Sequence, residues 1–212
     1  MRKIMLPIVF FFLIFMAGAQ NQQEIYVSSD LDNKLHFGVG FGIGFFNPGD
    51  VNDYIEDETN DLLITYGFST LIVNYSLRAT LCYSVTERID INFVGEYSLA
   101  PKIILVDGGD NLSYYFNKFS PGIVPKFYFP VGNSGRNSIF LAPGLLYNFM
   151  SFEDFSANSL GGKLEGGFSF KVGKTKMQPF AAFEYAKAVD DENHYKFEMN
   201  YTRFQIGMDF IF

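Results

Sequence analysis

The chain has 212 residues, enough for one domain, and carries 23 acidic against 16 basic residues, so its formal net charge is −7. An acidic chain is a poor partner for nucleic acid, because phosphate recognition depends on clustered Lys and Arg. The single cysteine, Cys82, excludes an internal disulfide framework.

The first twenty residues have the pattern of a secretory signal. A basic start, an apolar run and a small-residue site follow one another as Arg2-Lys3, Ile4–Met16 and Ala17-Gly18-Ala19. We therefore predict cleavage between Ala19 and Gln20, which makes residues 1–19 a signal peptide and residues 20–34 a polar periplasmic lead-in. A retained anchor is the alternative, but the apolar run is shorter than the about 20 residues that a spanning helix needs.

Beyond residue 34 the dominant pattern is a two-residue alternation, which is typical of a strand with two unlike faces. It is clearest from Leu35 to Phe46, where odd positions are bulky and apolar and the facing positions include Gly38, Gly40, Gly42 and Gly44. The remaining strands are predicted at 71–85, 89–99, 119–129, 139–149, 163–172, 178–186 and 203–212. No stretch after Ala19 approaches 18 consecutive apolar residues, so we predict an all-β fold over residues 35–212.

The connections between these strands alternate in length. Short ones are predicted near 86–88, 131–137 and 173–176, and long polar ones at 47–66, 101–118, 151–159 and 187–197. Short turns on one side and long loops on the other are typical of an outer-membrane barrel. Within the second long connection, Asp107-Gly108-Gly109-Asp110 is a hairpin turn signal, so the two flanking strands are expected to continue beyond the membrane.

Volume decides which face of the strands points outward. A soluble lipocalin-like barrel also has eight alternating strands, but it turns the apolar face inward. The interior of an eight-stranded barrel is just wide enough for its side chains, and the many phenylalanines would overfill it. We therefore predict a transmembrane antiparallel up-and-down barrel whose outward residues include Phe37, Phe41, Phe45, Phe93, Phe127, Phe129, Phe168, Phe170, Phe204, Phe210 and Phe212.

The opposite face, predicted to line the lumen, carries balanced charges. We predict a network of Arg78, Glu96, Lys126, Lys163, Glu165, Glu184, Arg203 and Asp209, with Asp90 and Lys171 on the same face. A packed plug is favoured over an ion pathway, which stays the alternative. The glycines of the first strand are expected to give the wall curvature and to leave room for large neighbours. They lack the following helix and the Lys or Ser of a phosphate-binding loop.

No catalytic, cofactor or metal site is predicted, and we predict that the protein is not an enzyme. His36 is placed near the periplasmic end and His194 in the last outer loop, so the two histidines cannot share a site. Cys82 is interpreted as a small buried side chain, and the alternative is a reactive thiol whose pKa is lowered by Arg78. The first long loop holds six carboxylates that suit Ca²⁺ or Mg²⁺, but they match no calcium-loop spacing and are interpreted as hydrated: Asp50, Asp53, Glu56, Asp57, Glu58 and Asp61.

The chain resembles the small outer-membrane β-barrel superfamily, which includes barrels like outer-membrane protein A and outer-membrane protein X. The resemblance covers Leu35 to the end and rests on pattern, except at the C-terminus. There the alternating residues Phe204, Ile206, Met208, Phe210 and Phe212 are similar to the terminal-strand signal of the barrel-assembly machinery. The family implies a Gram-negative outer-membrane location with both termini in the periplasm.

The resemblance implies no single task. Members include adhesins, structural proteins, narrow channels, assembly factors for secretion and a few lipid-modifying enzymes. The leading hypothesis is a barrel that acts in envelope structure, adhesion or partner binding through its extracellular loops. The alternative is a narrow porin-like transport path or a component of a secretion or assembly apparatus. Expected partners are outer-membrane lipid, lipopolysaccharide, the assembly machinery and an unknown envelope or extracellular partner.

Overall fold

The computed structural model describes residues 34–59, 64–66, 73–106, 111–131, 137–190 and 197–212. These residues belong to one compact unit, Lys34–Phe212. The predicted signal peptide, its cleavage site at Ala19 and Gln20, and most of the lead-in lie outside the described residues. In the described part of the chain, no helix is long and apolar enough to cross a membrane.

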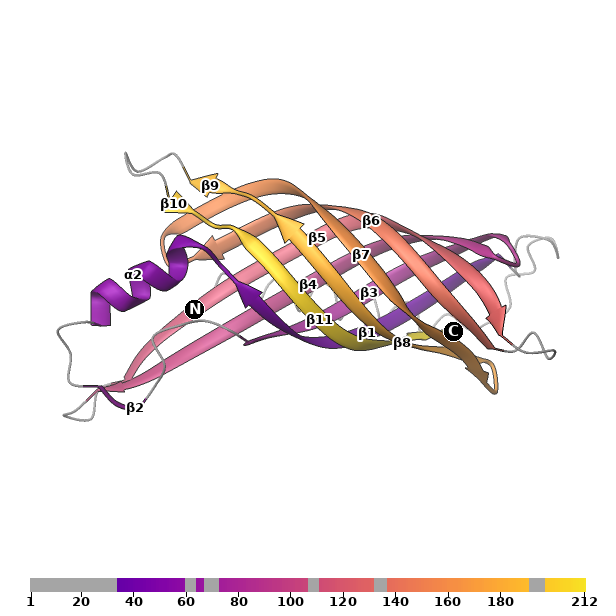
Figure 1. Ribbon diagram of the computed structural model, residues 1–212, viewed down its shortest axis with the longest axis horizontal. Coiled ribbons are helices and arrows are strands. Elements are labelled where there is room, and N and C mark those ends of the chain that lie inside the picture. Colours follow the sequence, from indigo (N-terminus) through magenta and orange to yellow (C-terminus); the bar gives the residue numbers. More distant parts are fainter. Residues whose placement is uncertain (1–33, 60–63, 67–72, 107–110, 132–136, 191–196) are drawn as a thin grey trace, which may run out of the picture. The chain divides into compact units, whose positions relative to one another are not determined.

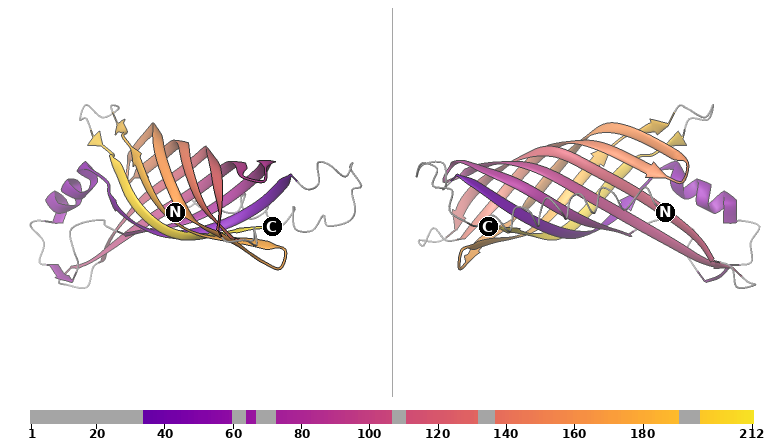
Figure 2. Two further views of the ribbon diagram at one scale, coloured as in Figure 1. Left: turned by 45° about the vertical axis from the view of Figure 1, so that its right-hand side comes forward. Right: turned by 180° about the vertical axis from the view of Figure 1, so that it is seen from behind.

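Eight long strands close into an antiparallel barrel (Figure 1). Around the barrel the order is β4-β3-β1-β11-β8-β7-β6-β5, and the β4–β5 pairing closes it. Figure 2 shows the same closed wall from two further sides. The predicted fold class is therefore confirmed, with strands β1 (Leu35–Asn47), β3 (Val73–Thr86), β4 (Ile89–Val106), β5 (Asn111–Val131), β6 (Asn137–Phe152), β7 (Phe155–Val172), β8 (Thr175–Ala186) and β11 (Tyr201–Ile211).

The strands pair with their neighbours in chain order, and β1 pairs with β11 through ten consecutive positions from Gly38↔Ile211 to Asn47↔Thr202. The C-terminus lies at the same end of the barrel as the β7–β8 turn, which we call the turn end (Figure 1). The opposite end, which we call the loop end, carries the shorter elements. These are α2 (Asp50–Thr59), β2 (Ile64–Tyr66), β9 (Val189–Asp190) and β10 (Phe197–Glu198).

The helix α2 corrects the prediction of a hydrated loop at 47–66. Val51, Ile55 and Thr59 recur every four residues, and all three are buried, so the helix has one buried stripe among its acidic residues. Asp50 and Asp53 lie in its first turn, where negative charge is favourable. The many carboxylates concealed this short period in the sequence.

Two other predicted loops are strand in the structure. Over residues 101–118 the β4–β5 ladder continues out to Leu105↔Asn111, which confirms that these strands extend past the predicted membrane level. The Asp107–Asp110 turn itself lies outside the described residues. The predicted loop at 151–159 is wrong, because β6 and β7 pair up to Phe152↔Phe155 and only Glu153 and Asp154 form the turn.

The outer face of the barrel is apolar, as predicted. Phe37 is 64% exposed, Phe93 49% and Phe168 59%. On β6 the apolar outward residues run from Ile139 to Phe149, with polar Asn137 and Ser151 beyond them. A stretch of about eleven residues, tilted as barrel strands are, gives an apolar band about 25 Å tall, which matches a bilayer core.

The glycines of β1 face the lumen and leave room for side chains from neighbouring strands. A Cβ built on Gly40 would lie 2.0 Å from the Asp209 carboxylate, and one on Gly42 would lie 2.1 Å from the Gln205 amide. Such distances are far inside van der Waals contact. The bare β1 wall therefore accommodates the large polar side chains of β11.

Candidate functional site

The centre of the lumen holds a cluster of nine buried charged side chains, here called the lumen cluster. Each member is at most 6% exposed, and each contacts at least one opposite charge. It contains all eight residues of the predicted network and one further lysine. The members are Arg78, Lys118, Lys126, Lys163, Arg203, Glu96, Glu165, Glu184 and Asp209.

Glu96 on β4 is the centre of this cluster. Its carboxylate accepts hydrogen bonds from Arg78 Nη2 at 3.2 Å, from Lys163 Nζ at 2.9 Å, and from Arg203. Strands β7 and β11 thereby meet β4 across the lumen, while Arg78 joins from the neighbouring strand β3, where it pairs with Glu96 in the ladder. Four strands are tied together at one carboxylate.

Arg78 extends the cluster toward the turn end. Its Nη1 atom lies 2.9 Å from Glu165 and 3.0 Å from Asp209, and its guanidinium carbon lies 4.5 Å from the centre of the Phe180 ring. Lys126 contacts the same two carboxylates, each at 3.2 Å. The charges are therefore shared rather than paired one to one, which satisfies more of their hydrogen-bonding capacity.

Lys118 is the member that the sequence interpretation missed, because it was assigned to a long loop. The side chain is fully buried, contacts Glu184 and lies 4.0 Å from the centre of the Tyr201 ring. Its even number matches the inward positions of β5, such as Ser120 and Lys126. Extending that parity backward from the predicted strand would have found it.

The remaining lumen-face charges lie at the turn end. Asp90 is buried and lies 3.4 Å from Lys176, while Lys171 is exposed at the end of β7 and is not part of the lumen interior, contrary to the prediction. Next to the lumen cluster lies an apolar group packed around Phe140, Leu146 and Phe180. The charged and apolar groups are in contact, because Arg78 lies over the Phe180 ring and Lys126 over the Phe140 ring.

At the loop end the interior becomes apolar and is covered by α2. Val51 and Ile55 are 0% exposed and belong to one buried cluster with Phe116, Phe152 and Tyr201. The Asp50 carboxylate accepts a hydrogen bond from the backbone N–H of Glu198 at 2.9 Å, which attaches the helix to the segment before β11. We call α2 and this apolar cluster the cap.

Tyr54 fixes the exposed edge of the cap. Its ring makes edge contacts with Phe152 and Phe155, with ring centres 5.7 and 5.8 Å apart. Burial raises the pKa of Tyr54 above its ordinary value, and the nearby carboxylates of Glu58, Glu153 and Asp154 add to the increase. The neutral phenol is therefore the form that this environment favours.

The two ends differ in charge. At the loop end the described charged side chains are mostly acidic, on α2, the β6–β7 turn and β10. At the turn end the side chains that are not buried are mostly basic, with Glu87 the acidic exception among the described residues. The basic group comprises Lys34, Arg88, Lys171, Lys174 and Lys176.

The other sequence candidates do not converge on a reactive centre. His36 is half-buried at the turn end and faces Cys82 across the β1–β3 ladder, and Cys82 is 1% exposed. His194 lies outside the described residues. Within the described part of the chain, no three His, Cys, Asp or Glu side chains are grouped to hold a metal ion, and the acidic residues of α2 make no such site.

The terminal-strand residues lie on the outer face of β11. Phe204 is 51% exposed, Ile206 56% and Phe212 57%, while Met208 and Phe210 are half-buried. The Phe210 ring lies 6.3 Å from that of Phe41. An alternating apolar edge is therefore present on the strand that closes the barrel against β1.

No family model and no curated protein matches the chain. Among solved structures, Neisserial surface protein A aligns with a TM-score of 0.56 at 13% identity, over 84% of this chain and 95% of that one. Ail, the attachment invasion locus protein of Yersinia pestis, aligns with a TM-score of 0.44 at 12% identity, over 84% of this chain and 98% of that one. OprG of Pseudomonas aeruginosa aligns with a TM-score of 0.44 at 14% identity, over 84% of this chain and 95% of that one. The chain has the fold of the small eight-stranded outer-membrane β-barrels. With its apolar outer band, this fold places the protein in an outer membrane.

Proposed function

We propose that this protein is a sealed outer-membrane barrel that presents the surface at its loop end to a partner, in adhesion, envelope structure or partner binding. The observation that carries the proposal is the closed lumen. The lumen cluster occupies its centre, and the cap covers its outer mouth with Val51 and Ile55 fully buried. A barrel so filled is suited to anchoring a surface rather than to conducting solutes.

The energetics of the lumen cluster support a seal. An ion that enters must displace buried pairs such as Arg78–Glu165 and Lys163–Glu96. Separating the partners of a buried pair costs about 3–5 kcal/mol, and several pairs share each carboxylate. The barrier to conduction is therefore high while the cluster is intact.

The loop end offers a structured surface for recognition. The last β5–β6 pair at the loop end is Phe116↔Phe152, and the β4–β5 hairpin continues beyond it to Leu105↔Asn111. The short strand β2 pairs with this outer part of β4. The exposed face of α2 adds the carboxylates of Glu56, Asp57 and Glu58. A surface of this charge suits a cationic partner, or lipopolysaccharide bridged by divalent cations.

Planar-bilayer recording of the purified full chain tests the proposal. We expect no steady current, and single-channel steps from the unaltered protein would overturn it. The double variant Glu96→Ala/Arg203→Ala, which removes two large side chains from the centre of the lumen, is the control for sensitivity. Its folding is checked by the heat-dependent shift in gel mobility that a closed barrel shows.

The alternative is a narrow transport path or a part of a secretion or assembly apparatus. The lumen cluster favours it, because five cations and four carboxylates are buried along the lumen and a rearrangement of Arg203 between Glu96 and Glu184 would open a polar route. The same recording separates the two functions. Recognition of the β11 edge by the barrel-assembly machinery is a further proposal, supported by its alternating apolar residues.

A further inference from the structure

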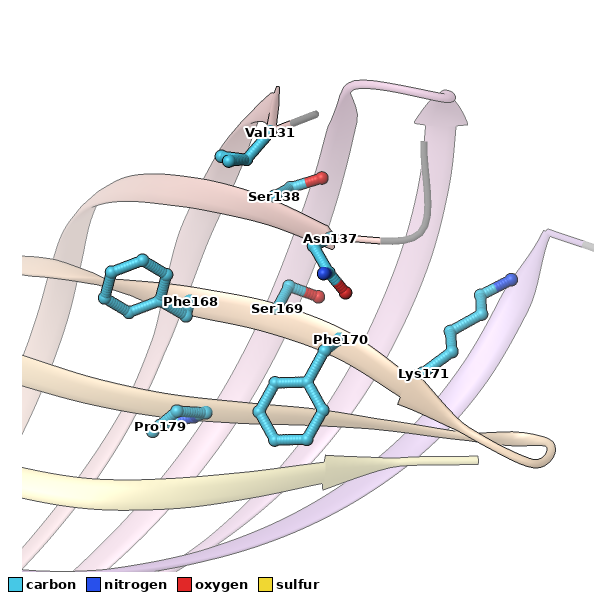
Figure 3. Close-up of a pocket in the computed structure, with 8 residues that line it drawn as sticks. All are labelled: Val131, Asn137, Ser138, Phe168, Ser169, Phe170, Lys171 and Pro179. Carbon is cyan, nitrogen blue, oxygen red and sulfur yellow. The ribbon is translucent and has the colours of Figure 1, made fainter. Parts of the chain in front are cut away.

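A groove of about 610 Å³ lies in the barrel wall at the turn end, where β6, β7 and β8 run side by side (Figure 3). Its lining combines two kinds of side chain. Phe168, Phe170 and Pro179 form an apolar part, and Asn137, Ser138 and Lys171 form a polar part. Its volume is within the range of small-molecule sites.

The groove exists because the β7–β8 ladder is interrupted there. The register passes from Gly167↔Phe180 directly to Phe170↔Met177, without pairing Phe168 or Ser169. Pro179 lies opposite this gap and has no backbone N–H to donate. The two strands therefore separate locally, and the Phe170 side chain lies between the β7 and β8 ribbons in the view of Figure 3.

The groove lies at the boundary between hydrocarbon and water. Phe168 and Val172, 59% and 57% exposed, are outward apolar residues of β7, and the turn Gly173-Lys174 follows. Asn137 is the first residue of β6 and is exposed. An amphiphile lying here would have its chains against the phenylalanines and its headgroup beside Lys171.

Lys171 is available to a ligand. Its Cα neighbour across the ladder is Lys176, which contacts Asp90 at 3.4 Å. Within the described residues no carboxylate lies within ion-pair distance of Lys171 itself, and its side chain is exposed. Lys34, Arg88 and Lys174 make the same end basic, so the local potential favours an anion.

From this geometry we propose that the groove binds one anionic phospholipid of the periplasmic leaflet. The phosphate contacts the Lys171 ammonium and the amide donor of Asn137, and an acyl chain lies along Phe168 and Phe170. The site is independent of whatever binds at the loop end, because it lies at the opposite end of the barrel. A barrel with this site would gather anionic phospholipid around its turn end.

Native mass spectrometry of the full chain, released from vesicles of equal phosphatidylglycerol and phosphatidylcholine with identical chains, tests the proposal. We expect one phosphatidylglycerol to be retained at least five-fold over phosphatidylcholine. Lys171→Gln should abolish this preference, whereas Lys187→Gln, which removes an exposed lysine at the loop end, should keep it. Phe170→Ala should weaken retention of the lipid while leaving Lys171 in place.

Three outcomes would overturn the site. Equal retention of the two lipids would show that the groove does not recognise the headgroup charge. If Lys171→Gln and Lys187→Gln lose the preference for phosphatidylglycerol equally, the preference comes from the net charge of the protein alone. Displacement of the lipid by millimolar inorganic phosphate shows a phosphate site without lipid recognition. Lys171 is exposed, so its variant is expected to fold, and Lys171→Arg retains the charge and should retain the preference.

Discussion

The middle of the barrel and its loop end have opposite polarity. In the middle the outer face is apolar and the interior charged, whereas at the loop end the interior is apolar and the outer face polar. On β5 the change takes four residues: Phe116 is buried inside and Asn117 faces out, then Lys118 is fully buried inside and Phe119 faces out. The wall is continuous, so the surrounding solvent, lipid or water, determines which face is apolar.

This inversion has an energetic consequence. The middle must satisfy buried charges with one another, because lipid surrounds it and the lumen is narrow. The loop end is stabilised as an ordinary water-soluble domain is, by burying Val51, Ile55 and aromatic rings. Perturbing a charge should therefore affect the whole barrel, and perturbing the cap should affect mainly the cap.

The largest effect is expected from Glu96→Ala. Three cations donate to this carboxylate, and its removal leaves them with fewer partners in a buried site, at a cost of about 3–5 kcal/mol. Urea unfolding of the barrel in lipid vesicles, followed by tyrosine fluorescence, measures the loss. Glu87→Ala in the exposed β3–β4 turn is the matched control and should change little. Equal midpoints for the two variants would contradict a stabilising role for the cluster.

A smaller and more local effect is expected from Ile55→Ala. Truncating a fully buried isoleucine costs about 2–5 kcal/mol, which should release α2 while the barrel stays closed. Limited proteolysis within residues 50–59 should accelerate at least ten-fold, with the heat-shift of the barrel unchanged. Asp53→Ala, on the exposed face of the same helix, is the control. A loss of barrel stability equal to that of Glu96→Ala would show that the cap and the lumen are one cooperative unit.

The inversion also explains which parts of the fold were predictable. Within the lipid-facing band the alternation keeps one phase, and the barrel strands predicted there are present. At Phe116 and Phe119 the apolar positions switch from even to odd, and at Phe149 and Phe152 they switch from odd to even. At such a switch the two-residue alternation of apolar residues is interrupted. The sequence pattern therefore predicts a loop where the strand in fact continues. On each strand the predicted lumen charges fall on the inward positions, but which charges pair across strands depends on register and shear, which no single strand encodes.

The third effect, about 1–3 kcal/mol, is expected from filling the bare β1 wall. In Gly40→Val the new side chain would collide with Asp209, whose carboxylate lies 2.0 Å from a built Cβ. Gly162→Val on β7 is the matched control, because a Cβ built there has nothing within 4 Å. Urea midpoints should separate the two variants. If Gly40→Val is as stable as the control, the lumen can accommodate a larger side chain beside Asp209, contrary to the close packing seen there.

The smallest effect concerns the pH dependence of the cap. The pKa of Tyr54 is raised above its ordinary value of 10.0 by burial and by Glu58, Glu153 and Asp154. A raised pKa in the folded state means that the contribution of the neutral phenol is present below pH 10 and is lost as the pH rises through the folded-state value. Proteolysis of α2 should therefore accelerate modestly above pH 10, while the heat-shift of the barrel stays unchanged. Tyr54→Phe keeps the ring contacts with Phe152 and Phe155 and removes the titrating group, so its α2 should be cut at a rate with less dependence on pH. If the rate of α2 proteolysis rises equally above pH 10 in Tyr54→Phe, the change belongs to other titrating groups of the cap. Ionisation of the Tyr54 phenol would then have no measurable effect on how α2 is held over the apolar interior.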